Sequence, residues 1–322
     1  MPAIGLPTWR GEPDDPVRVR RAIDTWAGSP AMARLVESFG GTTGDRAGHK
    51  LLGYLDAFSA ANWDFRRGRE RNLAGDAGLS SEQGDLVVGL APALGLAGIE
   101  RPTRGHYDTV LLTGGMVRAG VVKPRFVARL RQDGLSASHI VFLGGHRAFG
   151  GDEHALAAQL GVDGGDEVVA MLAGMEQAFG PLGDPTVECV VADTPHASWS
   201  EYSWFTGDVR LTVLAAPSSE PSARRANTAD TFRFWAGRRR TPAERSVLVV
   251  TTPIYVPYQA AGAVEVLGVD HGLTVETIGV DPAASDLGAL TQQFLPQHHL
   301  QELRSAIRAM RSLRARVAGS VL

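Results

Sequence analysis

Two pairs of adjacent glycines are the residues with the clearest chemical potential in this chain. The pairs are Gly114-Gly115 and Gly144-Gly145, and each directly follows a short run of mostly apolar residues. Glycine lets the backbone turn sharply and bring its N–H groups close to a ligand, and the N-terminus of a following helix favours negative charge. A tight turn alone explains one such pair, but two pairs predict a site for an anion or a carboxylate.

Basic and imidazole side chains accompany both glycine pairs. His146 and Arg147 follow the second pair, and Arg118 follows the first pair by three residues. A histidine can act as a general acid or base, and an arginine can hold a carboxylate or a phosphate with two hydrogen bonds. We therefore expect the two arginines to clamp an anionic ligand and His146 to move a proton.

The chain has polar residues after a further apolar run but no familiar catalytic motif. Thr251, Thr252 and Tyr255 lie at or just after the run 246–252, and their hydroxyls could face the same cleft. Neither glycine pair belongs to a GxGxxG fingerprint or a Walker A loop, and the chain contains no GxSxG or HExxH. Simple NAD binding, ATP hydrolysis, familiar serine hydrolases and zinc proteases are therefore not supported.

Helix starts explain two other polar segments. Asn227 is a good N-cap residue, and Asp230, three residues later, can reciprocate. Asp152 is expected to cap another helix, with Glu153 in its first turn. Asp152, Glu153 and His154 are consecutive and point in different directions, so we expect no metal site there.

A parallel sheet is the element that would bring these residues together. From residue 106 onward, short β-branched runs alternate with amphipathic segments of about ten residues, which is the βαβ pattern. Strands are expected at 108–113, 139–143, 187–192, 209–215, 246–252 and 274–279, and helices at 120–132, 153–160, 166–179, 227–237 and 257–268. Ligands of such sheets bind beyond the carboxyl ends of the strands, which is where the glycine pairs lie.

The first hundred residues form a separate region. They show helical periodicity at 17–27, 30–39 and 46–60. Segment 83–98 is almost wholly apolar, which suits either a buried helix or a short strand plus a turn, and we predict a helix. We therefore predict a helical appendage over 1–100. A Rossmann-like α/β domain over 101–322, with a mostly parallel sheet flanked by helices, would then end in an amphipathic helix.

The amphipathic pattern of that last helix is clear. Leucines and other apolar residues of 297–317 share one stripe, and arginines lie mostly elsewhere. We interpret the arginines as a solvated helix face and not as a nucleic-acid surface. An arginine-rich segment at 63–72 has two interpretations, a solvated helix end or a lid whose Arg69 or Arg71 reaches an anionic ligand.

The amino-acid composition indicates which binding partners and which cellular compartment to expect for this protein. The 322 residues include 32 basic and 35 acidic ones, a net charge of −3, so no global field attracts nucleic acid or an anionic membrane. No stretch approaches the roughly 18 apolar residues that span a bilayer, and no signal peptide is apparent. A cytoplasmic protein with a small-molecule ligand is expected, in which Cys189, the single cysteine, is a buried small hydrophobe.

The order of the motifs resembles the YdcF, SanA and ElyC family over about residues 106–280. The matching residues are Gly114, Gly115, Arg125, Gly144, Gly145, Glu167, Glu220, Asn227, Thr228, Thr251 and Thr252. The resemblance implies a Rossmann-like sheet. For the soluble branch similar to YdcF it also implies a site that accepts S-adenosylmethionine or a related nucleotide.

These observations lead to three hypotheses. The first is a cytoplasmic enzyme, a transferase or hydrolase, that binds a nucleotide-like ligand at the glycine-rich loops, with His146 or Glu167 moving a proton. The ligand would be held by Gly114, Gly115, Arg118, Gly144, Gly145, Arg147, Glu220, Asn227, Thr228, Thr251, Thr252 and Tyr255. The second is a non-catalytic module that binds a nucleotide or metabolite. The third is a nucleoside- or sugar-processing hydrolase of specialised metabolism.

Overall fold

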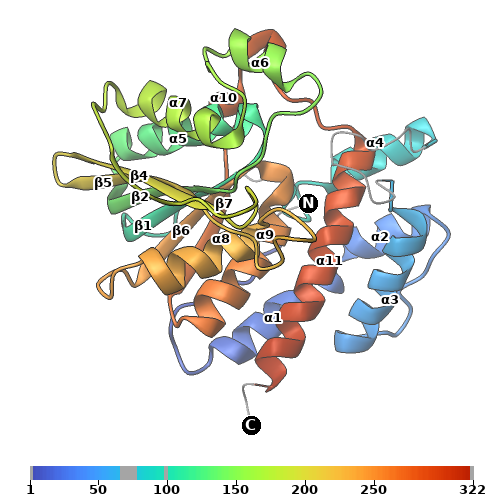
Figure 1. Cartoon of the computed structure of the whole chain (residues 1–322). Helices are drawn as coiled ribbons and strands as arrows, with labels where there is room; N and C mark the ends of the chain where they lie inside the picture. Colours follow the sequence, from blue (N-terminus) through green and yellow to red (C-terminus); the bar gives the residue numbers. More distant parts are fainter. Residues whose placement is uncertain (1–2, 66–77, 98–100, 320–322) are drawn as a thin grey trace. The chain divides into compact units, whose positions relative to one another are not determined.

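The computed structural model describes residues 3–65, 78–97 and 101–319. The chain forms two compact units, shown in Figure 1. A helical unit contains Met1–Gly98, Pro253–Glu265 and Gln293–Leu322, and a sheet unit contains Ile99–Thr252 and Val266–Gln292. The lid interpretation of Arg69 and Arg71 falls on residues outside the described part of the chain.

The sheet unit is built on seven strands in the order β3-β4-β5-β2-β1-β6-β7. The strands are β1 His106–Thr113, β2 Ser136–Gly144, β3 Thr186–Val190, β4 Trp199–Thr206, β5 Val209–Ala215, β6 Ser246–Thr251 and β7 Thr274–Gly279. Five of them, β5-β2-β1-β6-β7, run parallel, and β4 pairs antiparallel with both β3 and β5. The expected α/β class, with a mostly parallel sheet flanked by helices, is confirmed.

The central strands are apolar because both faces of the sheet are covered. Val110, Leu111, Ile140, Val141 and their neighbours are fully buried, as expected where helices pack on both sides of a parallel sheet. The helices and turns of this unit are α5 Val117–Gln132, α6 Glu153–Gln159, α7 Glu167–Phe179, α8 Thr228–Phe234, η2 Trp235–Arg239, α10 Pro282–Ser285 and η5 Gly288–Leu290. In Figure 1, α5 and α7 lie together on one face of the sheet and α8 lies on the other.

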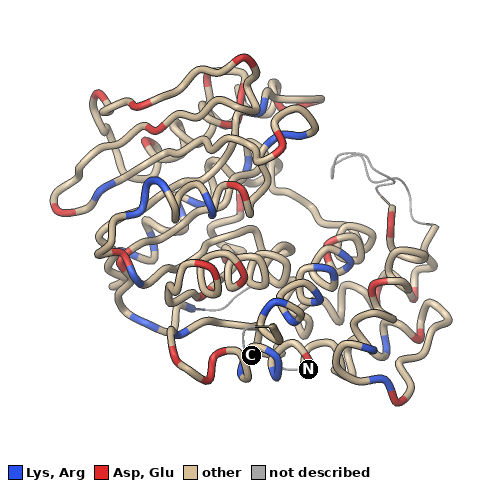
Figure 2. The backbone as a smooth tube through the Cα atoms, turned by 60° about the horizontal axis from the view of Figure 1, so that its bottom comes forward, with Lys and Arg blue, Asp and Glu red and all other residues tan. Residues whose placement is uncertain are grey.

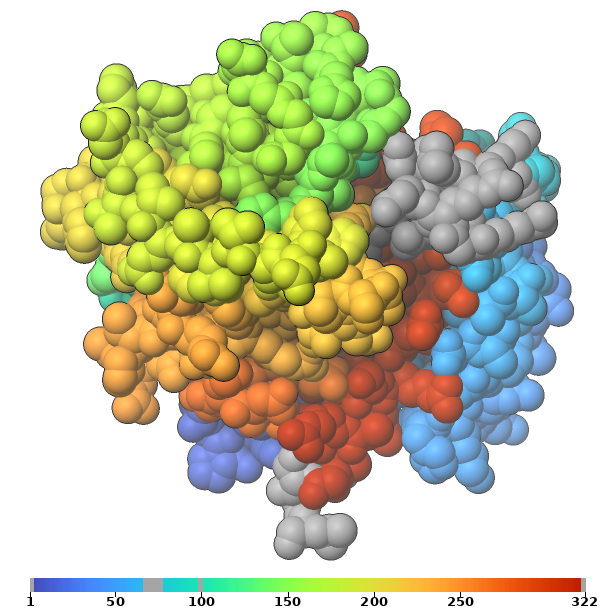
Figure 3. Space-filling model, in the orientation of Figure 1, coloured from blue at the N-terminus to red at the C-terminus, as the bar shows by residue number. Residues whose placement is uncertain are grey.

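Two expectations about the edge of the sheet were wrong. The strand β4 was not expected, because polar residues are scattered among its aromatic ones and leave no continuous apolar run. Cys189 is exposed, because β3 is an edge strand and every one of its residues is exposed. The lime and yellow atoms of this part of the chain lie at the surface in Figure 3.

The helical unit contains more of the chain than residues 1–100. Its elements are α1 Asp15–Ala27, α2 Pro30–Ser38, α3 Gly48–Asn62, α4 Ser81–Leu90, η3 Pro253–Tyr255, α9 Val256–Ala263 and α11 Pro296–Gly319. The π-helix η4 Val264–Asp270 continues α9 into the sheet unit. The last helix, α11, packs on α1, α3, α4 and α9, so it belongs with the N-terminal helices and does not close the sheet unit.

Ion pairs hold α11 in the helical unit. Its arginines pair with acidic residues of the N-terminal segments, for example Arg311 with Asp56 at 2.5 Å and Arg314 with Asp24 at 2.7 Å. Figure 2 shows basic and acidic segments interspersed along the chain. Among the described residues, no helix is long and apolar enough to cross a membrane.

A buried polar network joins three strands near the amino ends of the parallel strands. The Glu244 carboxylate accepts hydrogen bonds from His139 Nδ1 at 2.6 Å and from the Thr109 hydroxyl at 2.7 Å. His139 Nε2 lies 2.8 Å from the Thr212 hydroxyl on β5. Burial alone would raise the pKa of Glu244, but the hydrogen bonds from His139, Thr241 and Thr109 outweigh burial and hold that pKa at about 2.

Glu244→Gln should therefore destabilise the protein in a pH-dependent way. A carboxyl whose pKa is depressed in the folded state stabilises it above about pH 4.5 and loses this effect as the pH falls toward 2. We expect a cost of about 3 kcal/mol at pH 7 and about half of that at pH 3, measured by urea denaturation. Glu176→Gln, at an exposed site on α7, is the control and should change stability little. An equal cost at both pH values would contradict this role.

The helices α5 and α7 cross at a point where no side chain fits. A Cβ atom on Gly174 would overlap the carbonyl oxygen of Gly120, and one on Gly120 would lie 2.9 Å from the carbonyl oxygen of Ala170. Both obstacles are backbone atoms, which cannot rotate away. This close crossing fixes the position of α7, whose first residue is Glu167.

Gly174→Ala should cost about 1–3 kcal/mol because the added methyl group forces the two helices apart. The matched control is Gly89→Ala in α4, where an added Cβ has nothing within 4 Å. That control should leave stability unchanged or raise it by up to about 1 kcal/mol, because alanine has the higher helix propensity. Thermal unfolding of both variants measures the difference, and equal stabilities would refute the steric explanation.

Candidate functional site

The strand order places a topological switch point between β1 and β6. From β1 the chain proceeds to β2 and β5 on one side, then returns to β6 and β7 on the other side of β1. Open parallel sheets bind ligands at such a point, beyond the carboxyl ends of the strands. Here β1 leads into Gly114-Gly115 and β6 ends in Thr251, and the hydroxyls of Thr113 and Thr251 are 3.0 Å apart.

A buried carboxyl group, Glu167, occupies the space between the two glycine pairs. Its Oε1 accepts the N–H of Gly115 at 3.0 Å. A Cβ on Gly114 would overlap this oxygen, and one on Gly144 would lie 2.9 Å from it. Gly114 therefore leaves room for this carboxyl group, and Gly144 leaves room both for it and for the side chain of Met171, whose Cε would lie 2.7 Å from such a Cβ. The sequence alone did not reveal this reason.

Burial raises the pKa of Glu167, and the positive charges of Arg147 and Arg225 only partly oppose this effect. The effect of Arg225 shows that the loop after β5 brings a positive charge toward Glu167. A carboxyl that retains its proton to a higher pH than usual can donate that proton to a leaving group.

Arg147 is fully engaged by the protein. Its Nε donates to Glu167 at 3.2 Å, and its terminal nitrogens donate to both oxygens of Glu153 at 2.6 and 3.0 Å and to the carbonyl oxygens of Ala148 and Gly115. These bonds use all five N–H groups of the guanidinium. Arg147 therefore holds the loops after β1 and β2 together, whereas the sequence predicted that it would bind the ligand.

Glu153 completes this brace. Its carboxylate also accepts the N–H groups of Gly150 at 3.0 Å and Val117 at 3.3 Å. Burial would raise its pKa, but the hydrogen bonds from Arg147 and Gly150 hold that pKa below its usual range. Asp152 lies at the N-cap position of α6 without a side-chain capping bond, so it does not cap α6 as expected.

Lys123 is a site residue that sequence reasoning missed. It is 1% exposed and donates from Nζ to Thr113 Oγ1 at 3.0 Å, to the Gly114 carbonyl at 3.1 Å and to the Thr113 carbonyl. The sequence did contain an indication of this burial: Lys123 lies on α5 between Gly120 and Val127, at the helical spacing that places all three on the buried face. This lysine places a positive charge beneath the first glycine pair.

His146 lies at the carboxyl end of β2 and is half-buried. Burial lowers its pKa below the usual value, and the negative charge of Asp166 opposes that shift. The imidazole is therefore neutral at pH 7, with one ring nitrogen able to accept a proton. Its Nε2 lies 3.4 Å from the Ser200 hydroxyl on β4.

The loop after β5 is held by its own charges. Arg224 pairs with Glu220 at 2.9 Å and with Asp230. Asn227 and Asp230 form the predicted capping box, which is confirmed, and Thr228 is the first residue of α8. The loop passes close to the second glycine pair, because a Cβ on Gly145 would lie 3.2 Å from that of Ala226.

The remaining predicted site residues are placed as follows. Arg118 lies in the first turn of α5, and its Nε donates to the Leu290 carbonyl at 2.6 Å. Thr251 is fully buried, and Thr252 is half-buried. Tyr255 lies in η3, which belongs to the helical unit.

Two backbone N–H groups lie at the second glycine pair, one on the buried Gly145 and one on the half-buried His146. The Gly144 carbonyl accepts from Ala216, and the Arg147 carbonyl accepts from Glu167. The N–H groups of Gly145 and His146, which lie between them, have no acceptor among the described residues. Adjacent backbone N–H groups of this kind suit an anion. Within residues 3–65, 78–97 and 101–319, no cluster of His, Cys, Asp and Glu suits a metal ion.

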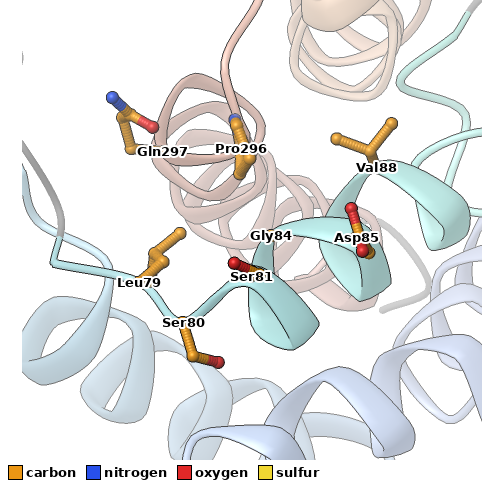
Figure 4. Close-up of a pocket in the computed structure, with 8 residues that line it drawn as sticks. All are labelled: Leu79, Ser80, Ser81, Gly84, Asp85, Val88, Pro296 and Gln297. Atoms are coloured by element: carbon orange, nitrogen blue, oxygen red, sulfur yellow. The ribbon is translucent and has the colours of Figure 1, made fainter.

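The pocket in Figure 4 belongs to the helical unit. It is lined by Ser80, Ser81 and Asp85 at the start of α4 and by Pro296 and Gln297 at the start of α11. Ser80 already forms a capping box with Gln83. Local capping therefore accounts for its hydroxyl, and no chemistry is assigned to this pocket.

Glu167 and Glu153 should respond to pH in opposite ways. The raised pKa of Glu167 means that its contribution to stability is greatest below about pH 4.5 and is lost as the pH rises through its folded pKa. The stability of the wild type minus that of Glu167→Gln should therefore fall as the pH rises above about 4.5. For Glu153→Gln, whose carboxyl has a lowered pKa, the same difference should fall as the pH drops below about 4.5 and stay level above about pH 5.5. Urea denaturation from about pH 3 to 8 measures both, and a Glu153 difference that changes above about pH 5.5 in the same direction as that of Glu167 would contradict the assignment.

Comparison with known proteins relates the whole chain to one group. The family described as the Rv3785 N-terminal domain matches residues 10–95. Two similar relatives are uncharacterized protein Rv3785 of Mycobacterium tuberculosis and uncharacterized protein Mb3814 of Mycobacterium bovis. Each is 34% identical over 336 aligned residues, which cover 95% of this chain and 92% of the relative. No solved structure matches.

These matches overturn the resemblance to the YdcF, SanA and ElyC family, which was wrong. The resemblance relied on glycine pairs at strand ends and on a helix that begins with glutamate. In this chain the first glycine of each pair makes room for neighbouring side chains, those of Glu167 and Met171. Such a requirement can arise in unrelated parallel sheets, so the order of these motifs does not identify a family.

Proposed function

The chain belongs to the Rv3785 family, and we propose that it is an enzyme that binds a nucleotide-like small molecule at the carboxyl edge of its sheet and carries out group transfer or hydrolysis on it. The observation that carries the proposal is Glu167. This buried carboxyl lies beside the topological switch point, contacts both glycine pairs and has a raised pKa. A carboxyl group with a raised pKa is suited to act as a general acid.

The charges around Glu167 favour an anionic part of the ligand. Arg147 pairs with both Glu153 and Glu167. The guanidinium group of Arg118 lies at the start of α5, and the positive charge of Arg225 acts on Glu167 from the loop after β5. A phosphate or carboxylate would meet this field together with the N–H groups of Gly145 and His146.

Two alternatives use the same site. A module that binds the ligand without chemistry would show binding and no product. A nucleoside- or sugar-processing hydrolase would act on a ligand without a phosphate. The expectation of S-adenosylmethionine came from the rejected resemblance, and this compound remains one arm of the ligand screen. The cytoplasmic location and the absence of a nucleic-acid partner also stay predictions.

A thermal-shift screen tests the binding part of the proposal. Nucleotides, nucleosides, S-adenosylmethionine and S-adenosylhomocysteine are added to the full chain, and a ligand of the folded state raises the melting temperature. For the compound that binds, Arg118→Ala should weaken binding about tenfold, because a charge-assisted contact is lost. Arg131→Ala, at the other end of α5, is the matched control. No shift with any compound would contradict a nucleotide-like ligand.

Turnover of the bound compound tests the catalytic part. Glu167→Gln keeps the shape of the side chain but removes its proton donor, so kcat should fall about a hundredfold while binding is retained. Product formation measured by chromatography gives the rate. Binding without product in the wild type would favour the non-catalytic module. Unchanged turnover in the variant would remove Glu167 from the mechanism.

A further inference from the structure

A second reactive group lies at the same edge of the sheet, on a strand that the sequence did not predict. Ser200, the second residue of β4, pairs with Ala215, the last residue of β5. Ala215 in turn pairs with Gly144, the last residue of β2. Ser200 is therefore level with the second glycine pair, at the carboxyl edge where the proposed ligand binds.

The Ser200 hydroxyl has a base within reach. Its Oγ lies 3.4 Å from Nε2 of His146, a separation typical of a nucleophile and its base before substrate binds. Ser200 is 4% exposed, so its hydroxyl meets little competing water. The negative charge of Asp166 also acts on His146 and would stabilise the imidazolium form.

The chain offers a second Ser–His pair for comparison. Ser136 Oγ lies 2.8 Å from His106 Nδ1, but at the start of β1 and β2, where the parallel strands begin. The Ser136 hydroxyl also donates to the Gly105 carbonyl at 3.3 Å, which occupies its proton. The His106 side chain is 56% exposed, so its environment is close to water. The Asp108 carboxylate lies 3.6 Å from His106 Nε2, so this pair also has an acidic neighbour, but it lies at the opposite edge of the sheet from the proposed ligand.

We propose that Ser200 is a nucleophile and His146 its general base, and that they hydrolyse an ester of the ligand through an acyl-enzyme. This inference rests on the proposed function, because it uses the same edge of the sheet. It replaces direct attack by water with two steps, each of which needs the same base. For this ester reaction His146, and not Glu167, gives the proton to the leaving group.

The two steps balance as follows. Ser200 Oγ attacks the ester carbonyl carbon and gives its proton to His146 Nε2, and His146 passes that proton to the departing alkoxide as the ester C–O bond breaks. Water then attacks the acyl carbon and gives a proton to His146. The bond to Ser200 Oγ breaks, and the proton returns to Ser200. A carboxylic acid and an alcohol leave, and no oxidant or metal is required.

Labelling with diisopropyl fluorophosphate tests the nucleophile directly in the full chain. We expect one diisopropylphosphoryl group per molecule, located on Ser200 by peptide mass spectrometry. No adduct, or an adduct on another residue such as Ser136, would overturn the proposal. This result needs no variant, so it does not depend on whether a substituted protein folds.

Three variants assign the roles. Ser200→Ala should abolish labelling, and His146→Gln should slow it about a hundredfold because the base is lost. Ser136→Ala, the control, should be labelled at the wild-type rate. Circular dichroism and thermal unfolding confirm that each variant is folded. Labelling of folded His146→Gln at the wild-type rate would remove His146 from the proposed pair.

The ligand screen separates this inference from the proposed function. If ligands still raise the melting temperature but the wild type is not labelled, the nucleophile is wrong and the binding site stands. If Ser200 is labelled but no nucleotide-like compound shifts the melting temperature, the nucleophile stands and the ligand class is wrong.

Discussion

The buried carboxylate of Glu167 is the interaction on which the arrangement of the sheet edge depends. It accepts the Gly115 N–H, pairs with Arg147 and fills the space where side chains at Gly114 and Gly144 would begin. The loops after β1 and β2 are thereby tied to the first turn of α7. A buried carboxyl without these partners would be costly, so the glycines, the arginine and the glutamate are mutually required.

The positions of these groups follow from how the helices pack. Gly174 and Gly120 let α5 and α7 approach until backbone meets backbone, and this contact fixes where α7 begins. Lys123, on the same helix α5, holds the end of β1 through carbonyl oxygens. The edge of the sheet is therefore a rigid frame, which is what a site needs if reacting groups are to stay aligned.

Residues with structural roles and residues with proposed chemical roles lie side by side at this edge of the sheet. Arg147 and Glu153 pair with each other and hold the loops in place. Glu167, His146 and Ser200 are the groups to which we assign proton transfer. The two arginines that looked alike in the sequence differ in this respect. Arg147 has all its donors engaged, whereas Arg118 is anchored through its Nε at the start of α5.

The sequence by itself determined the elements whose signals are local. The parallel strands, the helices between them and the capping box of Asn227 and Asp230 were predictable, because periodicity and capping involve residues a few positions apart. Only the tertiary structure decided which residues meet. Strand order and packing between distant segments decide that Cys189 is exposed and that Lys123 is buried. They also decide that α11 belongs to the helical unit and that Ser200 lies near His146. Short-range sequence patterns do not reveal these contacts, because the residues that bury each side chain or bond to it are distant from it in the sequence.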